Sequence, residues 1–181
     1  MPLTRARERI SFPASASTRF YLPLAIAATT NTATRYTITY IDYIIKKDTS
    51  SLSLCYEQTA VGSQTIIAGI YDGSNGLESA PLLFSGTIST SGAGIFTTSS
   101  SLFFRSGYYI VAGIATSVTP IVGRAFSTNY FSSANFGRPS SDASISTNGF
   151  YTQTGLTDLP STIGTITMNA ANVSPNIFLK Y

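Results

Sequence analysis

Short runs of β-branched and aromatic residues, separated by turn-forming residues, are the feature of this sequence that most constrains its fold. The run TRYTITYIDYII places Tyr36, Ile38 and Tyr40 on one face of an extended chain and threonines on the other. Runs of this kind, bounded by Gly, Ser, Asn and Pro, are typical of β-strands. No stretch of ten or more residues combines an apolar period of 3.6 with a capping residue at its start. The sequence therefore predicts an all-β protein.

About nine strands are expected from this pattern. They lie at residues 20–29, 34–45, 51–57, 64–72, 82–90, 95–104, 107–115, 162–168 and 175–181. The run at 34–45 becomes apolar on both faces from Ile41 onward, so we expect a further layer to cover its second face. Because a strand with an apolar face must bury it against another such face, we predict an antiparallel β-sandwich. A jelly roll is the first choice, and an immunoglobulin-like sandwich, whose Cys and Trp landmarks are missing, is the alternative.

An extended arm is expected at residues 1–19, ahead of a sandwich domain at 20–181, because the arm lacks any sustained apolar period. Its arginines are two residues apart, so an extended chain presents them on one side. Guanidinium groups suit carboxylates, since they bind them in bidentate geometry. The residues expected to bind a partner are Arg5, Arg7, Arg9 and Phe12. The alternative is a frayed terminus with no partner.

A long loop at about 118–160 is the second expected contact region. Loops of this length are uncommon in compact domains and are often functional. The residues that could contact a partner or a glycan are Tyr130, Phe131, Phe136, Arg138, Phe150 and Tyr151. The alternative, which we favour, is that these rings pack at one end of the sandwich or against a neighbouring subunit.

Charge is scarce in this chain, and its distribution excludes several partners. Only 10% of the residues are charged, against about 25% in ordinary soluble domains. The net charge is +3, and three arginines of the first ten residues account for most of the imbalance. We therefore expect no nucleic-acid partner, because such proteins carry a basic patch on the folded surface. No apolar run reaches the ~18 residues of a membrane span and no secretory signal is evident, so we expect a soluble protein without a membrane partner.

Catalytic and metal-binding chemistry finds little support in the residue types present. There is no histidine, which removes the usual general base, imidazole metal ligand and Ser-His-Asp triad. Asp72, Asn75 and Glu78 could supply oxygen ligands to calcium, but the order DGSNG fits a hairpin turn better. The single Cys55 cannot form an internal disulfide and is expected to be a packing residue. We predict no enzyme activity, no cofactor and no metal.

Three segments carry a resemblance to a known group of proteins. They read IIAGIYDGSNGLESAPLLFSGTIST, SLFFRSGYYIVAGIA and, at the end, GLTDLPSTIGTITMNAANVSPNIFLKY. Together they resemble a β-sandwich pattern that recurs in virion proteins of tailed bacteriophages, over roughly residues 64–181. None of these motifs is catalytic, and they describe a fold more than a task. The resemblance implies a structural component of the virion, often trimeric, on tail fibres, baseplates or capsid surfaces.

Three functions remain open at this point. The first is an oligomeric capsid accessory protein of the decoration, cement or head-fibre type, expected to be a trimer, made in the host cytoplasm and located in the virion. Its arm would attach it to the major capsid protein or another virion protein, because repeated weak contacts gain from effective concentration. The second is a tail-fibre or baseplate module that recognises a host surface glycan. The third, ranked last, is a depolymerising enzyme that uses paired carboxylates.

Overall fold

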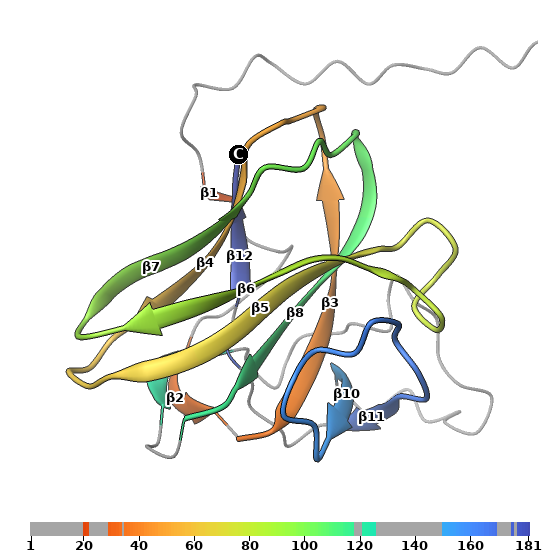
Figure 1. Cartoon of the computed structure of the whole chain (residues 1–181). Coiled ribbons are helices and arrows are strands. Elements are labelled where there is room, and N and C mark those ends of the chain that lie inside the picture. The colour runs from red at the N-terminus through yellow and green to blue at the C-terminus, as the bar shows by residue number, and fades with distance from the viewer. Residues whose placement is uncertain are drawn as a thin grey trace, which may run out of the picture.

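The chain folds into two stacked antiparallel sheets (Figure 1). The computed structural model describes residues 20–21, 29–33, 35–117, 121–125, 150–169, 175 and 177–181, and no helix occurs in this part of the chain. The predicted all-β sandwich is confirmed. The strands are β1 (Phe20–Tyr21), β2 (Thr29–Ala33), β3 (Thr37–Ile45), β4 (Leu52–Gln58), β5 (Gln64–Asp72), β6 (Leu82–Thr90), β7 (Gly94–Ser100), β8 (Gly107–Ala115), β9 (Ile121–Ala125), β10 (Phe150–Thr154), β11 (Thr167–Asn169) and β12 (Ile177–Lys180).

The strand pairing is that of a jelly roll. Eight strands pair as a nested series in which β5 lies beside β6, β4 beside β7, β3 beside β8 and β2 beside β9. This is the order produced when one long antiparallel ribbon is folded over into two sheets. The β4 sheet contains β1, β12, β4, β9, β2 and β7, and the β3 sheet has the order β11-β10-β3-β8-β5-β6. The predicted jelly roll is therefore confirmed.

The last strand completes the β4 sheet. Leu54 of β4 pairs with Thr98 of β7 on one side and with Leu179 of β12 on the other. Further along β4, Gln58 pairs with Gly123 of β9 on the side that β12 occupies. Strands β9 and β12 therefore share one edge of β4, so residues far apart in sequence close this sheet.

The main core lies between the sheets and comes from alternate residues of each strand. From β5 it contains Ile66, Ala68 and Ile70, all fully buried, as the period-2 pattern predicts. The two sheets lie close together at Gly113 of β8, where a Cβ atom would lie 2.6 Å from Cγ1 of Ile177 in β12. A larger side chain at Gly113 would therefore force the two layers apart.

A second core covers the outer face of the β3 sheet. The segment that follows β10 places Leu159 and Ile163 over Tyr40 and Tyr71 (Figure 1). The two tyrosine rings meet edge to face, with centroids 5.8 Å apart. The Tyr40 hydroxyl donates to Oε1 of Gln153 at 2.5 Å, and the Tyr71 hydroxyl donates to the Pro160 carbonyl at 2.9 Å. A further layer therefore covers the second face of the run at Ile38 and Tyr40, but it does not extend to Ile44, which is 52% exposed although the expectation rested on the residues from Ile41 onward.

The strand expected at 162–168 is reduced to β11 (Thr167–Asn169), and two further segments differ from the strand prediction. Residues 118–160 were expected to be loop throughout, but β9 pairs with β2 and β10 pairs with β3 within that range. The strand expected at 95–104 ends at Ser100, because the chain leaves the β4 sheet there and crosses to the β3 sheet. In both places long-range pairing partners, which a local pattern does not contain, decide the strand ends.

Candidate interaction surfaces

The contact residues expected from the sequence fall mostly outside the described residues. This holds for the arm residues Arg5, Arg7, Arg9 and Phe12, and for the loop residues Tyr130, Phe131, Phe136 and Arg138. Phe150 and Tyr151 lie on β10, where Tyr151 pairs with Tyr40 of β3 and Met168 of β11. The backbone of these two residues is therefore part of the β3 sheet and not of a loop.

The segment around Asp72 forms a turn. The Asp72 carboxylate accepts a hydrogen bond from the Ser74 backbone at 2.9 Å, and the Gly76 backbone donates to the Gly73 carbonyl at 3.1 Å. Gly76 has a φ of 97°, a conformation that favours glycine. In the described part of the chain no group of three or more His, Cys, Asp or Glu residues could hold a metal ion. The turn geometry is that expected from the order DGSNG.

Cys55 is a packing residue with an unreactive thiol. Its neighbours Leu54 and Tyr56 point into the main core, so Cys55 points to the outer face of the β4 sheet, yet it is fully buried. Burial raises the pKa of its thiol from 9.0 to about 11. Because the thiolate is the nucleophilic form, a thiol with this pKa stays protonated and inert at neutral pH.

The first candidate surface is the uncharged edge, which consists of the outward-facing residues of β6 and β7. Among the described strands each of these two ends a sheet, since β6 pairs with β5 alone and β7 with β4 alone. No Asp, Glu, Lys or Arg occurs from residue 79 to residue 104. The exposed residues of the edge are Leu83, Ser85, Thr87, Ser89, Ile95, Thr97 and Ser99.

The uncharged edge also leaves part of the core close to solvent. Phe84 of β6 and Phe96 of β7 point inward and pack against the main core, but both are only partly buried. The two strands come close at Gly86, where a Cβ atom would meet the Thr98 side chain. Burial is therefore less complete along this edge than at the centre of the sandwich.

The second candidate surface is the basic tip, which lies at the end of the sandwich where the β3–β4 and β7–β8 connections meet (Figure 1). Thr49 and Phe104 exchange two backbone hydrogen bonds, each of 2.8 Å. The Asp48 carboxylate accepts a third from the Ser106 backbone at 2.6 Å. Phe104 is buried and meets the Tyr109 ring edge to face, at 5.8 Å between centroids. The two connections therefore form one hydrogen-bonded platform anchored in the core.

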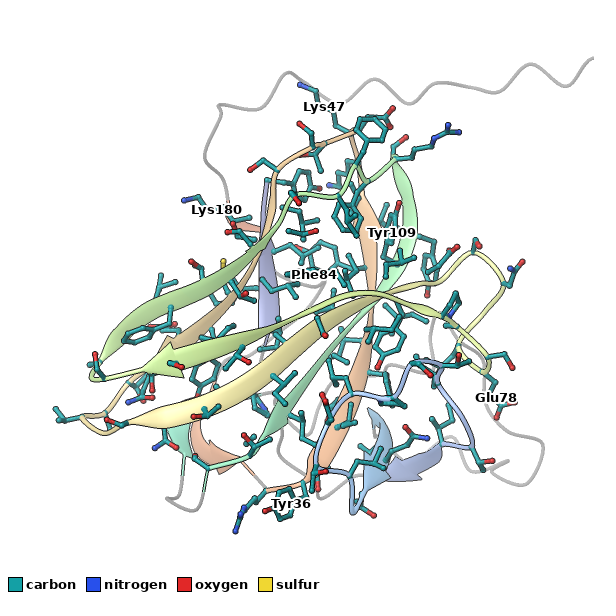
Figure 2. The ribbon with its side chains drawn as sticks, in the orientation of Figure 1. Tyr36, Lys47, Glu78, Phe84, Tyr109 and Lys180 are labelled. Carbon is teal, nitrogen blue, oxygen red and sulfur yellow. The ribbon has the colours of Figure 1, made fainter. Side chains whose placement is uncertain are left out.

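The platform turns its other side chains outward. Phe103 is 62% exposed and Leu102 is 46% exposed, although both are large and apolar. Three exposed cations lie on the same two connections, and Figure 2 shows Lys47 at one end of the described part of the chain. The basic tip is defined as Lys46, Lys47, Leu102, Phe103 and Arg105. This combination of cations and exposed apolar side chains suits a partner that is both anionic and apolar.

Neither surface was predicted from the sequence. The signals were the segments IIKKD and SLFFRS, where apolar residues adjoin cations, but they are 58 residues apart at Asp48 and Ser106. The segment SLFFRS also resembled the end of a strand, which concealed that β7 ends at Ser100 and that Leu102 and Phe103 lie outside the sheet.

Comparison with protein-family models, curated proteins and solved structures found no match. Across the described ranges, helices of the length and apolarity that a membrane crossing requires are absent. The function is therefore argued from the fold and the two surfaces.

Proposed function

We propose that this chain is a structural protein of a bacteriophage particle, an oligomeric capsid accessory protein of the decoration, cement or head-fibre type. It assembles with copies of itself, and the expected oligomer is a trimer. Its N-terminal arm, residues 1–19, attaches it to the major capsid protein or another virion protein. The jelly roll and the resemblance of residues 64–181 support this proposal. The observation that carries it is the uncharged edge.

The argument rests on how natural proteins treat exposed edge strands. Monomeric proteins protect such strands with charged side chains, proline or bulges, because an unprotected edge pairs with other chains. Strands β6 and β7 are nine and seven residues long and contain neither charge nor proline. The register irregularity of β6 lies at its start, where Leu83 is skipped between the pairs Ile70–Phe84 and Tyr71–Leu82, so the rest of the strand is regular. Charged residues are also depleted from the centres of protein interfaces. An edge of this composition is suited to contact with another subunit.

The oligomer is tested by sedimentation velocity over a range of protein concentrations. A charge placed in the uncharged edge by Ile95→Lys should weaken the oligomer, because Ile95 is 49% exposed on β7 and a lysine there would be buried in the interface. Val61→Lys is the matched control, since Val61 is 91% exposed on a loop. A wild-type protein that stays monomeric at every concentration would contradict the proposal.

Attachment is tested separately by deleting residues 2–12. The shortened protein should keep its oligomeric state but no longer sediment with purified capsids. Retained capsid binding would remove the arm from the proposal and leave the oligomer in place. Binding of the isolated protein to a host surface glycan, lost on Tyr130→Ala and Phe131→Ala, would instead support the tail-fibre or baseplate alternative.

A further inference from the structure

We propose that the basic tip is a docking surface for an anionic lipid bilayer. Leu102 and Phe103 enter the headgroup region, while Lys47 and Arg105 contact the lipid phosphates and carboxylates. This inference does not depend on the oligomer or on the arm, since it uses only residues of the β3–β4 and β7–β8 connections.

Rigidity of the platform is the first step of the argument. The paired backbone hydrogen bonds of Thr49 and Phe104 and the buried Phe104 ring hold the two connections together. The Tyr109 hydroxyl adds a hydrogen bond to the Arg105 carbonyl, of 2.9 Å. Leu102 and Phe103 are therefore presented in the free protein, and docking needs little further ordering of the backbone.

The charge of the platform is the second step. Its one acid, Asp48, is turned toward the Ser106 backbone amide. Lys47 and Arg105 are exposed on the same two connections that carry the apolar pair Leu102 and Phe103. Clustered cations attract anionic lipid surfaces, and apolar side chains next to them add binding by leaving water.

Size and composition favour a bilayer over a protein partner. A specific protein interface buries about 800 Å² on each partner, and lysine is depleted from such interfaces. The basic tip consists of two short connections at the extremity of the molecule, and two of its three cations are lysines. A small protruding surface suits insertion into a lipid headgroup layer. The sequence-based expectation of no membrane partner considered only spanning segments, so it does not bear on peripheral docking.

The experiment is co-sedimentation of the full chain with vesicles of phosphatidylcholine alone and of phosphatidylcholine mixed with phosphatidylserine. Wild-type protein should bind only the mixed vesicles, and salt should weaken binding because charges are screened. Phe103→Ser should reduce binding roughly tenfold, as expected when one large apolar side chain stays in water. Lys47→Glu and Arg105→Glu should each reduce it by roughly tenfold or more, because each reverses a charge.

Matched controls lie at the opposite end of the sandwich. Val61→Ser removes another exposed apolar side chain, and Arg35→Glu reverses another exposed charge, so both should bind like the wild type. The protein lacking residues 2–12 should also bind. Absence of wild-type binding, or binding that the tip variants do not change, would overturn the proposal. If the tip variants instead impair only capsid binding or oligomerisation, the basic tip docks onto protein and the lipid proposal fails.

Discussion

The two ends of the sandwich are closed in different ways. At the basic tip, backbone hydrogen bonds and the buried Phe104 ring hold the connections together. At the opposite end, side-chain hydrogen bonds hold the β4–β5 connection. Nε2 of the buried Gln58 donates to the carbonyls of Ala60 at 2.8 Å and Gly62 at 2.7 Å. The Thr90 hydroxyl donates to Oε1 of Gln58 at 2.5 Å.

This difference determines which side chains each end can offer to a partner. Gln58, Gln64 and Thr90 are committed to closing their end, and Gln64 also accepts a hydrogen bond from Ser117 at 2.7 Å. A network of this kind specifies the loop that it holds. At the basic tip the backbone closes the structure, so bulky and charged side chains stay available. At one end buried polar side chains stabilise the fold, whereas at the basic tip the backbone does so and exposed side chains can contact a partner.

The largest expected effect comes from removing the anchor of the basic tip. Phe104→Ala should lower the free energy of unfolding by about 3–5 kcal/mol, because it deletes a buried ring from the core. Phe103→Ala, one residue earlier and exposed, should stay within about 0.5 kcal/mol of the wild type. Urea denaturation measures both. Similar losses for the two variants would contradict the opposite orientations of the two rings.

The dependence of stability on alkaline pH tests the burial of titratable side chains in the part of the sandwich between its two ends. Burial raises the pKa of Cys55 from 9.0 to about 11, and it raises the pKa values of Tyr40, Tyr56 and Tyr71 in the same direction. The unfolded chain therefore loses these protons at a lower pH than the folded chain. The contribution of these groups to the free energy of unfolding is fully present below pH 9 and decreases as the pH rises toward 11. Cys55 alone should account for about 2–3 kcal/mol.

The alkaline effect is measured by urea denaturation at a series of pH values. Cys55→Ala should lose less stability across this pH range than the wild type, since it has no thiol to titrate. A stability that does not change between pH 8 and pH 11 would contradict the burial of these groups.

The side-chain network of the opposite end is tested next. Gln58→Leu removes the side-chain donor to the carbonyls of Ala60 and Gly62. It should lower the free energy of unfolding by about 1–3 kcal/mol for each buried group that is left without a partner. Val61→Ser, in the same loop but exposed, is the control and should be neutral. Hydrogen exchange should show faster opening of residues 59–63 in Gln58→Leu only. Unchanged exchange there would mean that the backbone alone closes this end.

The smallest expected effect separates stability from binding at the basic tip. Asp48→Ala should lower the free energy of unfolding by about 0.5–1.5 kcal/mol, because it removes the hydrogen bond from the Ser106 backbone to the Asp48 carboxylate. It also removes the only acid of the platform, so binding to anionic vesicles should strengthen while stability falls. Thermal unfolding and co-sedimentation measure the two effects. A parallel loss of both would show that the basic tip binds only when Asp48 holds the connections together.

Several strands could be predicted from local pattern alone. The expected bounds 64–72, 82–90 and 107–115 coincide with β5, β6 and β8. These runs alternate or are continuously apolar and are bounded by turn residues, so their own sequences define them. The end of β7 could not be predicted in this way, because Leu102 and Phe103 continue the apolar pattern after the chain has left the β4 sheet.

The candidate surfaces were less accessible to sequence reasoning. A basic, apolar contact region was expected, and it was assigned to the arm and to the loop after β9, which lie outside the described residues apart from Phe150 and Tyr151. The basic tip was missed because each half of it is short and unremarkable. The contacts of Thr49 with Phe104 and of Asp48 with Ser106 make the halves one surface.

The sequence by itself determined that the chain forms antiparallel sheets and which side chains of β4 face the main core, because alternation is a property of neighbouring residues. In β3, where Ile38 and Tyr40 face the second core, only the tertiary structure decided which face each layer covers. Tertiary structure decided the nesting of the strands, the position of β6 and β7 at the sheet edges, and the meeting of the β3–β4 and β7–β8 connections at Thr49 and Phe104. The physical reason is that the period of a strand identifies its buried face but carries no information about which distant strand will pair with it.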